Sequence, residues 1–290
     1  MNTCPWCGKP SQKSYLKLKD EFLTHEDFEI FECDHCHLLF TVPRPTPDKI
    51  GSYYLSDEYY SHQENKSGFI PRIYECVKSI NLKHKVYLAT EGMANGKLLD
   101  IGCGVGDFLI QVRQKQWEVV GIEPSDAAKA IAEHRLGFKP LDPSASRELG
   151  DASFDVVTMW HVLEHVDDLK TQVSELSRLL KSGGRLVLAL PNYLSYDAEY
   201  YRDKWAAWDV PRHLNHFSPF AISTIFSETD LEIVDIQKLR WDAYYISFLS
   251  EKYLGHRLPL VRGIIKGLKS NRLARVSGNY SSLVYILKKN

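Results

Sequence analysis

The sequence predicts an α/β fold, in which a doubly wound parallel β-sheet carries a small metal-binding module at its N-terminal end. Three observations lead to this prediction. Apolar, strand-like segments alternate with amphipathic helical segments between residues 97 and 191. The first of these strands runs into a glycine-rich turn, and the turn runs into a helix. Two C-x-x-C pairs lie within residues 1–45.

The composition is that of a globular enzyme. The chain has 290 residues, 44% of them apolar and 25% charged, which is enough for one large domain and a small one. A formal net charge of −1 argues against attraction of the whole molecule to nucleic acid. No apolar run approaches 18 residues and no signal segment is evident, so we expect a cytoplasmic protein. Its six cysteines should then be reduced or metal-bound.

The N-terminal cysteines have the spacing of a structural zinc site. Cys4 pairs in sequence with Cys7, and Cys33 pairs with Cys36. Each pair can place two thiolates on one tetrahedral ion, and two pairs complete a four-cysteine site. A redox pair or four free thiols are the alternatives. Because four thiolates leave no open coordination position, we expect a structural zinc ribbon over residues 1–45.

Prolines near residue 45 indicate a linker into a helical and aromatic region, residues 46–95. A helix is expected from about residue 70 to residue 88, where apolar residues lie near one stripe. We interpret this region as a helical cap on a main domain that comprises residues 96–290. The alternative interpretation is that Tyr59, Tyr60 or His62 lines the mouth of a binding site.

The glycine-rich turn is the first candidate for a binding site. Gly102, Gly104 and Gly106 follow a short buried strand, at positions where side chains would obstruct a ligand that approaches the backbone. A strand, a glycine turn and a helix N-terminus form a cradle for a nucleotide-type ligand. Asp107 replaces the third glycine of the dinucleotide pattern G-x-G-x-x-G. An acid there repels a pyrophosphate but tolerates a cationic ligand, which disfavours a nicotinamide enzyme.

A second strand, residues 117–122, ends in another acid. Glu123 lies 23 residues after Asp100, where a carboxylate can bind both hydroxyls of a ribose. Ser125 is expected to cap the helix that follows, and Gly137 is expected to end it.

Two further strands are expected at residues 154–160 and 185–190, with an amphipathic helix between them. Ligands of doubly wound sheets bind beyond the carboxyl ends of the strands. The glycine turn, Glu123, residues 160–165 and Asn192 all fall at that edge.

The C-terminal third combines an aromatic segment with a basic one. Residues 193–219 are too aromatic for an ordinary solvated loop, so we interpret them as a lid on the substrate side. Residues 241–279 form a basic helical insertion before the last strand. Within it, residues 258–273 alternate apolar and basic side chains. We interpret them first as an ordinary helix that packs on the domain with a solvated basic face. The alternative is an interfacial helix that makes a peripheral membrane contact.

Together these segments resemble the class I S-adenosylmethionine-dependent methyltransferases. The resemblance covers residues 96–240 and the last strand. It rests on the glycine-turn segment, on Glu123, on the run WHVLEHV that begins at Trp160, and on the run LLKSGGRLVLALPN that ends at Asn192. The run DVPRHLNHFSP over residues 209–219 is similar to the small-molecule-modifying branch of that family. The resemblance implies a seven-stranded, Rossmann-like sheet with an antiparallel last strand.

The resemblance also implies a cofactor site. The glycine turn would approach the methionine part of S-adenosylmethionine, Glu123 would hold its ribose, and Trp160 and His161 would flank it. The predicted cofactor-binding residues are Asp100, Gly102, Cys103, Gly104, Gly106, Phe108, Glu123, Pro124, Ser125, Trp160 and His161. An acid that meets the adenine is not evident, and Asp142 is a candidate for it.

Histidines near this edge are candidates for a catalytic base. Transfer of a methyl group to oxygen is helped by removal of a proton, which an imidazole near neutral pKa can accept. His161 and His213 are our catalytic candidates, with His165 and His216 as further ones. Each of them can instead cap a helix or pack in the lid. Arg212 can anchor an anionic group of the substrate.

We therefore predict a small-molecule methyltransferase that uses S-adenosylmethionine and carries a structural Zn²⁺ ion. The candidate acceptors are a sugar nucleotide, a glycan or lipid intermediate, and a quinone-like ring. One alternative is an RNA methyltransferase, because a zinc module ahead of such a domain resembles some ribosomal-RNA guanine methyltransferases. The acids among residues 1–45 argue against it. A non-catalytic module that recruits a partner is the other alternative.

Overall fold

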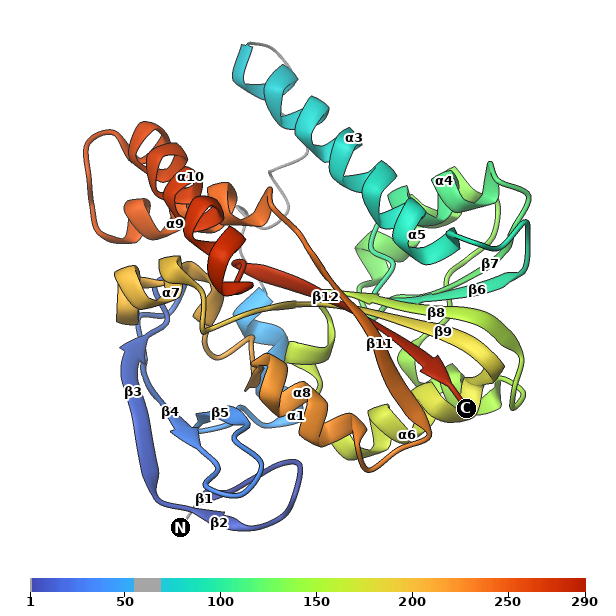
Figure 1. Ribbon diagram of the computed structural model, residues 1–290, viewed down its shortest axis with the longest axis horizontal. Coiled ribbons are helices and arrows are strands. Elements are labelled where there is room, and N and C mark those ends of the chain that lie inside the picture. Colours follow the sequence, from blue (N-terminus) through green and yellow to red (C-terminus); the bar gives the residue numbers. More distant parts are fainter. Residues whose placement is uncertain (1, 55–68) are drawn as a thin grey trace.

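The computed structural model describes residues 2–54 and 69–290 of the chain. In this part a six-stranded β-sheet with helices on both faces forms the main body, and a smaller sheet built mostly from N-terminal residues lies beside it (Figure 1). The predicted α/β class is confirmed. Tyr59, Tyr60 and His62, which we considered for the mouth of a site, lie outside the described residues.

The large sheet has four parallel strands and an antiparallel pair at one side. Its strand order is β11-β12-β9-β8-β6-β7, and β12 runs antiparallel to both β9 and β11. The strands are β6 (Lys97–Ile101), β7 (Glu118–Ile122), β8 (Phe154–Trp160), β9 (Leu180–Pro191), β11 (Leu231–Lys238) and β12 (Ser282–Lys289). The central strands are buried on both faces, as their nearly continuous apolar sequences require.

The described residues contain six strands in this sheet instead of the seven that the resemblance implied. The missing edge strand would follow β7 and its helix. At that place Leu141 forms only a single parallel bridge with Ile122. Pro140 and Pro143 flank Leu141, and because proline lacks a backbone N–H, a longer ladder cannot form there.

Helices cover the two faces of the sheet as the alternating pattern predicted. The expected helical cap begins and ends close to its predicted bounds, as α3 (Phe69–Thr90). The other covering helices are α4 (Asp107–Arg113), α5 (Asp126–Leu136), α6 (Leu169–Leu179) and α8 (Pro219–Phe226). The Ser125 hydroxyl accepts a hydrogen bond from Ala128 N, and Gly137 ends α5 in the left-handed region, both as predicted.

The N-terminal module is completed by a strand from the main domain. Its four-stranded sheet has the order β10-β5-β4-β3, and β10 comes from the aromatic segment. The strands are β3 (Lys13–Lys19), β4 (Asp27–Glu32), β5 (Leu39–Val42) and β10 (Asn215–His216); a separate hairpin joins β1 (Asn2–Thr3) to β2 (Pro10–Ser11). Residues 1–45 therefore do not complete their own sheet. α1 (Pro47–Ile50) and η1 (Gly51–Tyr54) follow β5.

Much of the aromatic segment, which we predicted to be a lid on the substrate side, is buried in a packed core. It contains α7 (Tyr196–Tyr201), η4 (Arg202–Lys204) and η5 (Ala206–Trp208). Trp205, Trp208 and Val210 are buried against residues of β3, β4 and β5. The aromatic content that suggested a ligand-facing surface instead buries apolar area between the two sheets.

The basic insertion forms a helical hairpin at one end of the molecule, α9 (Asp242–Tyr253) and α10 (Pro259–Ser277) (Figure 1). Small residues on α10 allow a close approach: a Cβ added at Gly263 would lie 2.6 Å from Phe248 Cα, and one at Gly267 would lie 2.8 Å from Tyr244 Cδ1. No helix within residues 2–54 or 69–290 is both long and apolar enough to cross a bilayer.

Candidate active site

The glycine turn between β6 and α4 presents one open position. All three glycines have positive φ, at 76° for Gly102, 54° for Gly104 and 82° for Gly106. A Cβ at Gly102 would lie 2.4 Å from Val162 Cγ2, and one at Gly106 would lie 2.9 Å from Leu136 Cδ1. At Gly104 it would meet nothing within 4 Å. Only Gly104 therefore faces space that a ligand can enter, and the outer two glycines serve the internal packing of the turn.

Glu123 ties this turn to the next helix. Its Oε2 accepts a hydrogen bond from Gly104 N at 2.8 Å, and its Oε1 accepts one from Ser125 N at 2.9 Å. The carboxylate is buried beside the open position of the turn. Each carboxylate oxygen can accept more than one hydrogen bond, so both remain able to receive hydroxyl donors. Pro124 lies between these two residues, directly before α5.

Two charged or reactive side chains of the turn do not face a ligand. The Cys103 thiol lies against Gly121, and burial raises its pKa, so it stays protonated. Asp107 forms ion pairs with Lys78, at 2.8 Å, and with Arg135. Two cations therefore already compensate the charge of Asp107, so this carboxylate contributes little to the choice of ligand.

The other predicted cofactor residues of β6, α4 and β8 pack together beneath this edge. Asp100 is fully buried and accepts a hydrogen bond from Thr158 Oγ1 at 2.6 Å; burial raises its pKa to about 7. The rings of Phe108 and Trp160 are 5.5 Å apart in a T-shaped pair. Lys85 Nζ lies 4.9 Å from the Trp160 ring centroid. Among the described residues, the buried Trp160 Nε1 has no hydrogen-bond partner.

His161 adopts a left-handed backbone conformation, with φ of 59°, directly after β8. Its Nε2 lies 3.0 Å from Asp242 Oδ2, and its Nδ1 lies 3.5 Å from Glu164 Oε1. Burial alone would lower the pKa of His161, but the two carboxylates outweigh it and raise this pKa to about 9. At neutral pH His161 is an imidazolium and cannot accept a proton, which disfavours our prediction that it is the base.

Beyond His161 lies a buried histidine cluster, which we define as Glu164, His165, His213 and His216. Glu164 and His165 belong to η3 (Leu163–His165), and the other two flank or belong to β10. The rings of His165 and His213 are 4.6 Å apart. His216 Nε2 lies 2.9 Å from Thr41 Oγ1 of β5. The cluster thus adjoins the predicted cofactor edge through the pair of Glu164 and His161.

Burial keeps two of these imidazoles uncharged. Burial and the neighbouring His213 lower the pKa of His165 to about 4, and burial lowers that of His216 well below its usual value. His213 Nδ1 donates to the carbonyl oxygen of Ala207 at 2.9 Å. Its Nε2, which carries the lone pair in the neutral ring, lies 3.9 Å from Asp209 Oδ2. Together with Glu164 and Tyr193, His213 lines a small hollow in this region.

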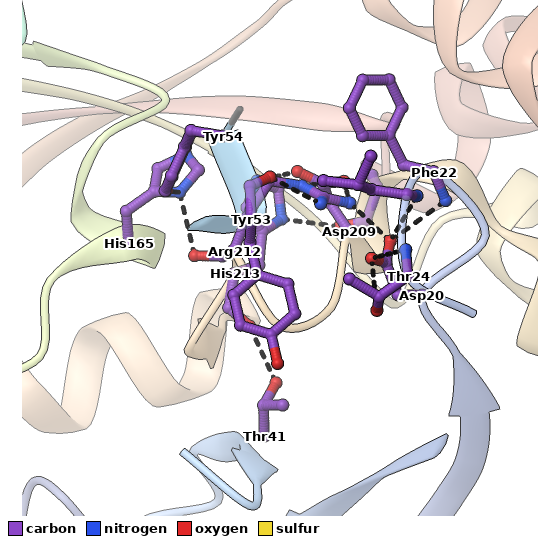
Figure 2. Close-up of polar contacts among 12 residues, drawn as sticks. Asp20, Phe22, Thr24, Thr41, Tyr53, Tyr54, His165, Asp209, Arg212 and His213 are labelled. Carbon is purple, nitrogen blue, oxygen red and sulfur yellow. Dashed lines mark hydrogen bonds and ion pairs between the residues drawn. The ribbon is translucent and has the colours of Figure 1, made fainter. Parts of the chain in front are cut away.

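Arg212 directs most of its donors to acceptors within the protein. Its Nη2 donates to Asp20 Oδ1 at 2.9 Å and to Asp209 Oδ1 at 2.7 Å, and its Nη1 donates to the carbonyl oxygen of Tyr53 at 3.1 Å (Figure 2). The side chain is almost completely buried. These contacts assign Arg212 to the joint between the N-terminal hairpin and the main domain and disfavour the predicted role as a substrate anchor.

Asp142, the candidate acid for binding the adenine amine, already forms an ion pair. Asp142 follows Leu141 at the edge of the sheet, as expected, but it is bound by Lys129 of α5. An adenine amine would have to compete with this ammonium group.

The four predicted zinc ligands converge in two matching knuckles. Cys4 Sγ lies 3.5 Å from Cys36 Sγ, Cys7 Sγ lies 3.5 Å from Cys33 Sγ, and all four sulfurs lie within 4.8 Å of one another. A tetrahedral zinc ion with bonds of about 2.3 Å requires sulfur separations of about 3.8 Å. In each knuckle the residue after the second cysteine has positive φ, 70° at Gly8 and 56° at His37.

Several residues of this region carried no signal that we recognised in the sequence. Asp242 was not associated with His161, because it follows a different strand. Lys85 was counted only as a position of the cap helix. Glu164 lies inside the run WHVLEHV. A carboxylate between two histidines, His161 and His165, is the sequence signal that could have identified it.

Comparisons with known proteins agree with this architecture. A family model described as "Methyltransferase domain" matches residues 75–236. A ubiquinone biosynthesis O-methyltransferase of Pseudomonas aeruginosa is 34% identical over 108 residues, which are 35% of this chain and 47% of the relative. A protein of the same name from Idiomarina loihiensis is 25% identical over 176 residues, or 56% of this chain and 72% of the relative. The chain thus spans about half the length of the Pseudomonas relative.

Solved structures share the fold at low identity. A geranyl diphosphate C-methyltransferase of Streptomyces coelicolor A3(2) matches with a TM-score of 0.55 and 14% identity, over 85% of this chain and all of the other. The [4+2]-cyclase SpnF matches with a TM-score of 0.51 and 20% identity, over 72% of this chain and 79% of the other. The same fold therefore occurs in proteins with different reactions, and the site must decide among them.

Proposed function

This chain belongs to the methyltransferase-domain family, and we propose that it transfers the methyl group of S-adenosylmethionine to an oxygen of a small, quinone-like ring. The relatives named ubiquinone biosynthesis O-methyltransferase support this acceptor class. The observation that carries the cofactor assignment is the open backbone at Gly104, beside the Glu123 carboxylate. Within residues 2–54 and 69–290 no atom outside Gly104 and its chain neighbours lies within 4 Å of a Cβ built at Gly104, and the Glu123 carboxylate, which can accept hydrogen bonds from hydroxyl groups, stands next to it.

The cofactor, when bound, supplies a methyl group that its sulfonium already activates. The chain's own residues then have to orient the two partners and receive a proton. Gly104 would admit the methionine part at the turn that Gly102 and Gly106 shape, and Glu123 would bind the ribose. His161, held as an imidazolium by Asp242 and Glu164, would position groups at this edge without taking a proton. His213, whose Nε2 keeps a lone pair, is the proposed proton acceptor.

The assignment is tested by binding of S-adenosylhomocysteine in a calorimeter. Glu123→Gln removes the anionic acceptor and should weaken this binding by at least about tenfold. Glu118→Gln, at the other end of the same strand and exposed, is the matched control and should bind normally. Formation of S-adenosylhomocysteine from S-adenosylmethionine, with hydroxylated quinones against sugar nucleotides as acceptors, tests the acceptor class. Equal affinity in the Glu123 variant would reject the ribose assignment.

We also propose that Cys4, Cys7, Cys33 and Cys36 hold a structural Zn²⁺ ion. Their sulfur separations fit a tetrahedral ion after small adjustments. The ion would fix the two knuckles at the end of the sheet that β10 completes. Four protein ligands leave no open position, so this ion would not take part in methyl transfer.

A further proposal concerns the α9–α10 hairpin, which we expect to bind the surface of an anionic membrane. The small residues of α10 face α9, so apolar side chains remain exposed on its outer side, among them Leu258, Ile265 and Val276. Residues 252–290 carry nine basic residues and no acidic ones. Sedimentation with phosphatidylglycerol vesicles should deplete the protein, and Ile265→Asp should reduce this, whereas Val234→Asp on exposed β11 should not. Binding to total RNA alone would reject the membrane proposal.

A further inference from the structure

We propose that Glu164, His165 and His213 bind a divalent transition-metal cation, separate from the four-cysteine site. One potential ligand atom from each residue lies within 4.8 Å of the others. The residues come from two segments that a backbone hydrogen bond joins, from Leu214 N to the Glu164 carbonyl oxygen at 2.8 Å. The sheet and the aromatic segment therefore fix the three side chains around one point.

The burial of the Glu164 carboxylate is the main observation that supports a bound cation. Only 1% of its surface is exposed, and within residues 2–54 and 69–290 neither of its carboxylate oxygens has a hydrogen-bond partner. His161, the side chain that faces it, has its Nδ1 3.5 Å from Oε1, and its Nε2 is taken up by Asp242 at 3.0 Å. A buried carboxylate with two unused oxygens is costly unless a positive group binds it.

Both histidines present the nitrogen that a cation needs. His213 Nδ1 lies 2.9 Å from the Ala207 carbonyl oxygen, and His165 Nδ1 lies 3.0 Å from the Arg212 carbonyl oxygen (Figure 2). A carbonyl oxygen only accepts, so in each neutral ring Nδ1 carries the proton and Nε2 is the atom with the lone pair. The Tyr54 hydroxyl also lies 3.0 Å from His165 Nδ1. Metal-binding histidines are held in the same way, by a hydrogen-bond acceptor at the ring nitrogen that does not bind the metal.

The surrounding charge favours a cation as well. Asp209 Oδ2 lies 3.9 Å from His213 Nε2, and Arg212, the guanidinium on this side, is already shared between Asp209 and Asp20. Asp209 thus places a second carboxylate beside one of the three proposed ligands.

The donor set indicates which cations fit. Two imidazoles and one carboxylate suit Zn²⁺, Co²⁺ or Ni²⁺ better than Mg²⁺ or Ca²⁺, which prefer oxygen ligands. Ligands of such ions stand about 3 Å apart, so the three side chains would close slightly on binding. Three protein ligands leave positions open for an oxygen of another molecule.

A role for this cation in the reaction rests on the proposed methyl transfer, whereas the binding itself does not. An acceptor hydroxyl that binds at an open position would ionise more readily on the ion. His213 would then serve as a ligand, and ionisation of the hydroxyl would no longer depend on it as a base.

Cobalt(II) tests the site in the full chain. The zinc-loaded protein is stripped of weakly held ions with a chelator and titrated with CoCl₂, while metal content and the visible spectrum are followed. We expect one Co²⁺ per chain with a d–d spectrum and without the near-ultraviolet thiolate band that a cobalt-substituted cysteine site would show. Glu164→Gln and His213→Asn should each weaken Co²⁺ binding at least about tenfold. The asparagine amide can still donate to Ala207.

Controls separate this proposal from a folding defect and from the proposed function. His216→Gln, which can keep the bond to Thr41, should bind Co²⁺ as the wild type does. Thermal melting identifies variants that do not fold, and the two ligand variants provide independent tests. Wild-type Co²⁺ affinity in both folded ligand variants, or no Co²⁺ beyond the cysteine site, would overturn the proposal. Binding of S-adenosylhomocysteine in the same samples reports on the proposed function independently.

Discussion

Asp20 Oδ1 accepts a hydrogen bond from Arg212 Nη2 at 2.9 Å, across 192 residues of sequence. Both side chains are fully or almost fully buried. The same Asp20 carboxylate accepts hydrogen bonds from the backbone N–H groups of Phe22 and Thr24 (Figure 2). Because Arg212 also binds Asp209, this pair connects the turn between β3 and β4 to the segment that carries the histidine cluster.

Loss of this pair should destabilise the whole fold. Asp20→Asn leaves part of the Arg212 charge buried without its partner, so we expect the free energy of unfolding to fall by about 3 kcal/mol. Asp27→Asn is the control, because its pair with Lys19 is exposed; it should change the stability by less than about 0.5 kcal/mol. Urea denaturation followed by tryptophan fluorescence measures both. Equal stability of the two variants would contradict the structural role of Arg212.

The pair of Asp20 and Arg212 also predicts how the stability of the protein changes at acid pH. Burial would raise the pKa of Asp20, but the hydrogen bonds from Arg212 and the backbone outweigh it and lower this pKa below its ordinary value. A carboxyl with a depressed folded-state pKa stabilises the protein above its unfolded pKa, and this contribution is lost as the pH falls through the folded value. The stability difference between wild type and Asp20→Asn should therefore shrink below about pH 4. A difference that stays constant down to acid unfolding would argue against it.

The two glycines of the turn should respond differently to alanine. At Gly104 a methyl group meets open space, so Gly104→Ala should fold with a loss of about 1 kcal/mol from its positive φ. Its binding of S-adenosylhomocysteine should be strongly reduced, since the methyl group fills the entry. At Gly102 the methyl group collides with Val162, so Gly102→Ala should lose more stability than Gly104→Ala does. Normal cofactor binding by Gly104→Ala would place the ligand elsewhere.

His161 should stabilise the protein more at neutral than at alkaline pH. Its pKa is raised to about 9 in the folded chain, because Asp242 and Glu164 outweigh the effect of burial. A raised pKa adds stability that is fully present below the unfolded value of about 6.5 and is lost as the pH rises through 9. The advantage of wild type over His161→Asn should thus decrease by about 1–2 kcal/mol between pH 6 and pH 10. His134→Asn, an exposed change on α5, is the control.

Removal of a zinc ligand should release the N-terminal module. Cys33→Ser is expected to lose one zinc ion per chain and to lower the melting temperature, because the knuckles no longer share an ion. His35→Ala, an exposed change in the same knuckle, should retain both the metal and the stability. Metal content by mass spectrometry and thermal melting measure the outcome. Wild-type protein that contains no metal and melts at the same temperature after chelation would contradict the zinc assignment.

Local patterns were enough to predict much of the fold. The apolar runs that became β6, β7, β8 and β9 alternate with helices whose caps, Ser125 and Gly137, were visible in the sequence. In a parallel sheet the carboxyl ends of these strands meet at one edge. The convergence of the glycine turn with Glu123 followed from this geometry without knowledge of any contact.

Where local patterns misled, the tertiary contacts explain why. The aromatic content of residues 193–219 does not distinguish a ligand-facing lid from a buried interface, and only the packing of Trp205 and Trp208 against the N-terminal sheet decides it. Likewise, an edge strand was implied around Leu141, but its neighbouring prolines cannot donate to a ladder.

The sequence by itself determined the strand–turn–helix cradle, the position of Glu123 and the pairing of the cysteines, because these depend on residues close in the chain or on the regular geometry of a sheet. Only the tertiary structure decided which side chains are charged and which are already bound to a partner. Arg212 is occupied by Asp20, and His161 is charged by Asp242, because the electrostatic environment of a buried group is set by distant segments that packing brings within a few ångströms.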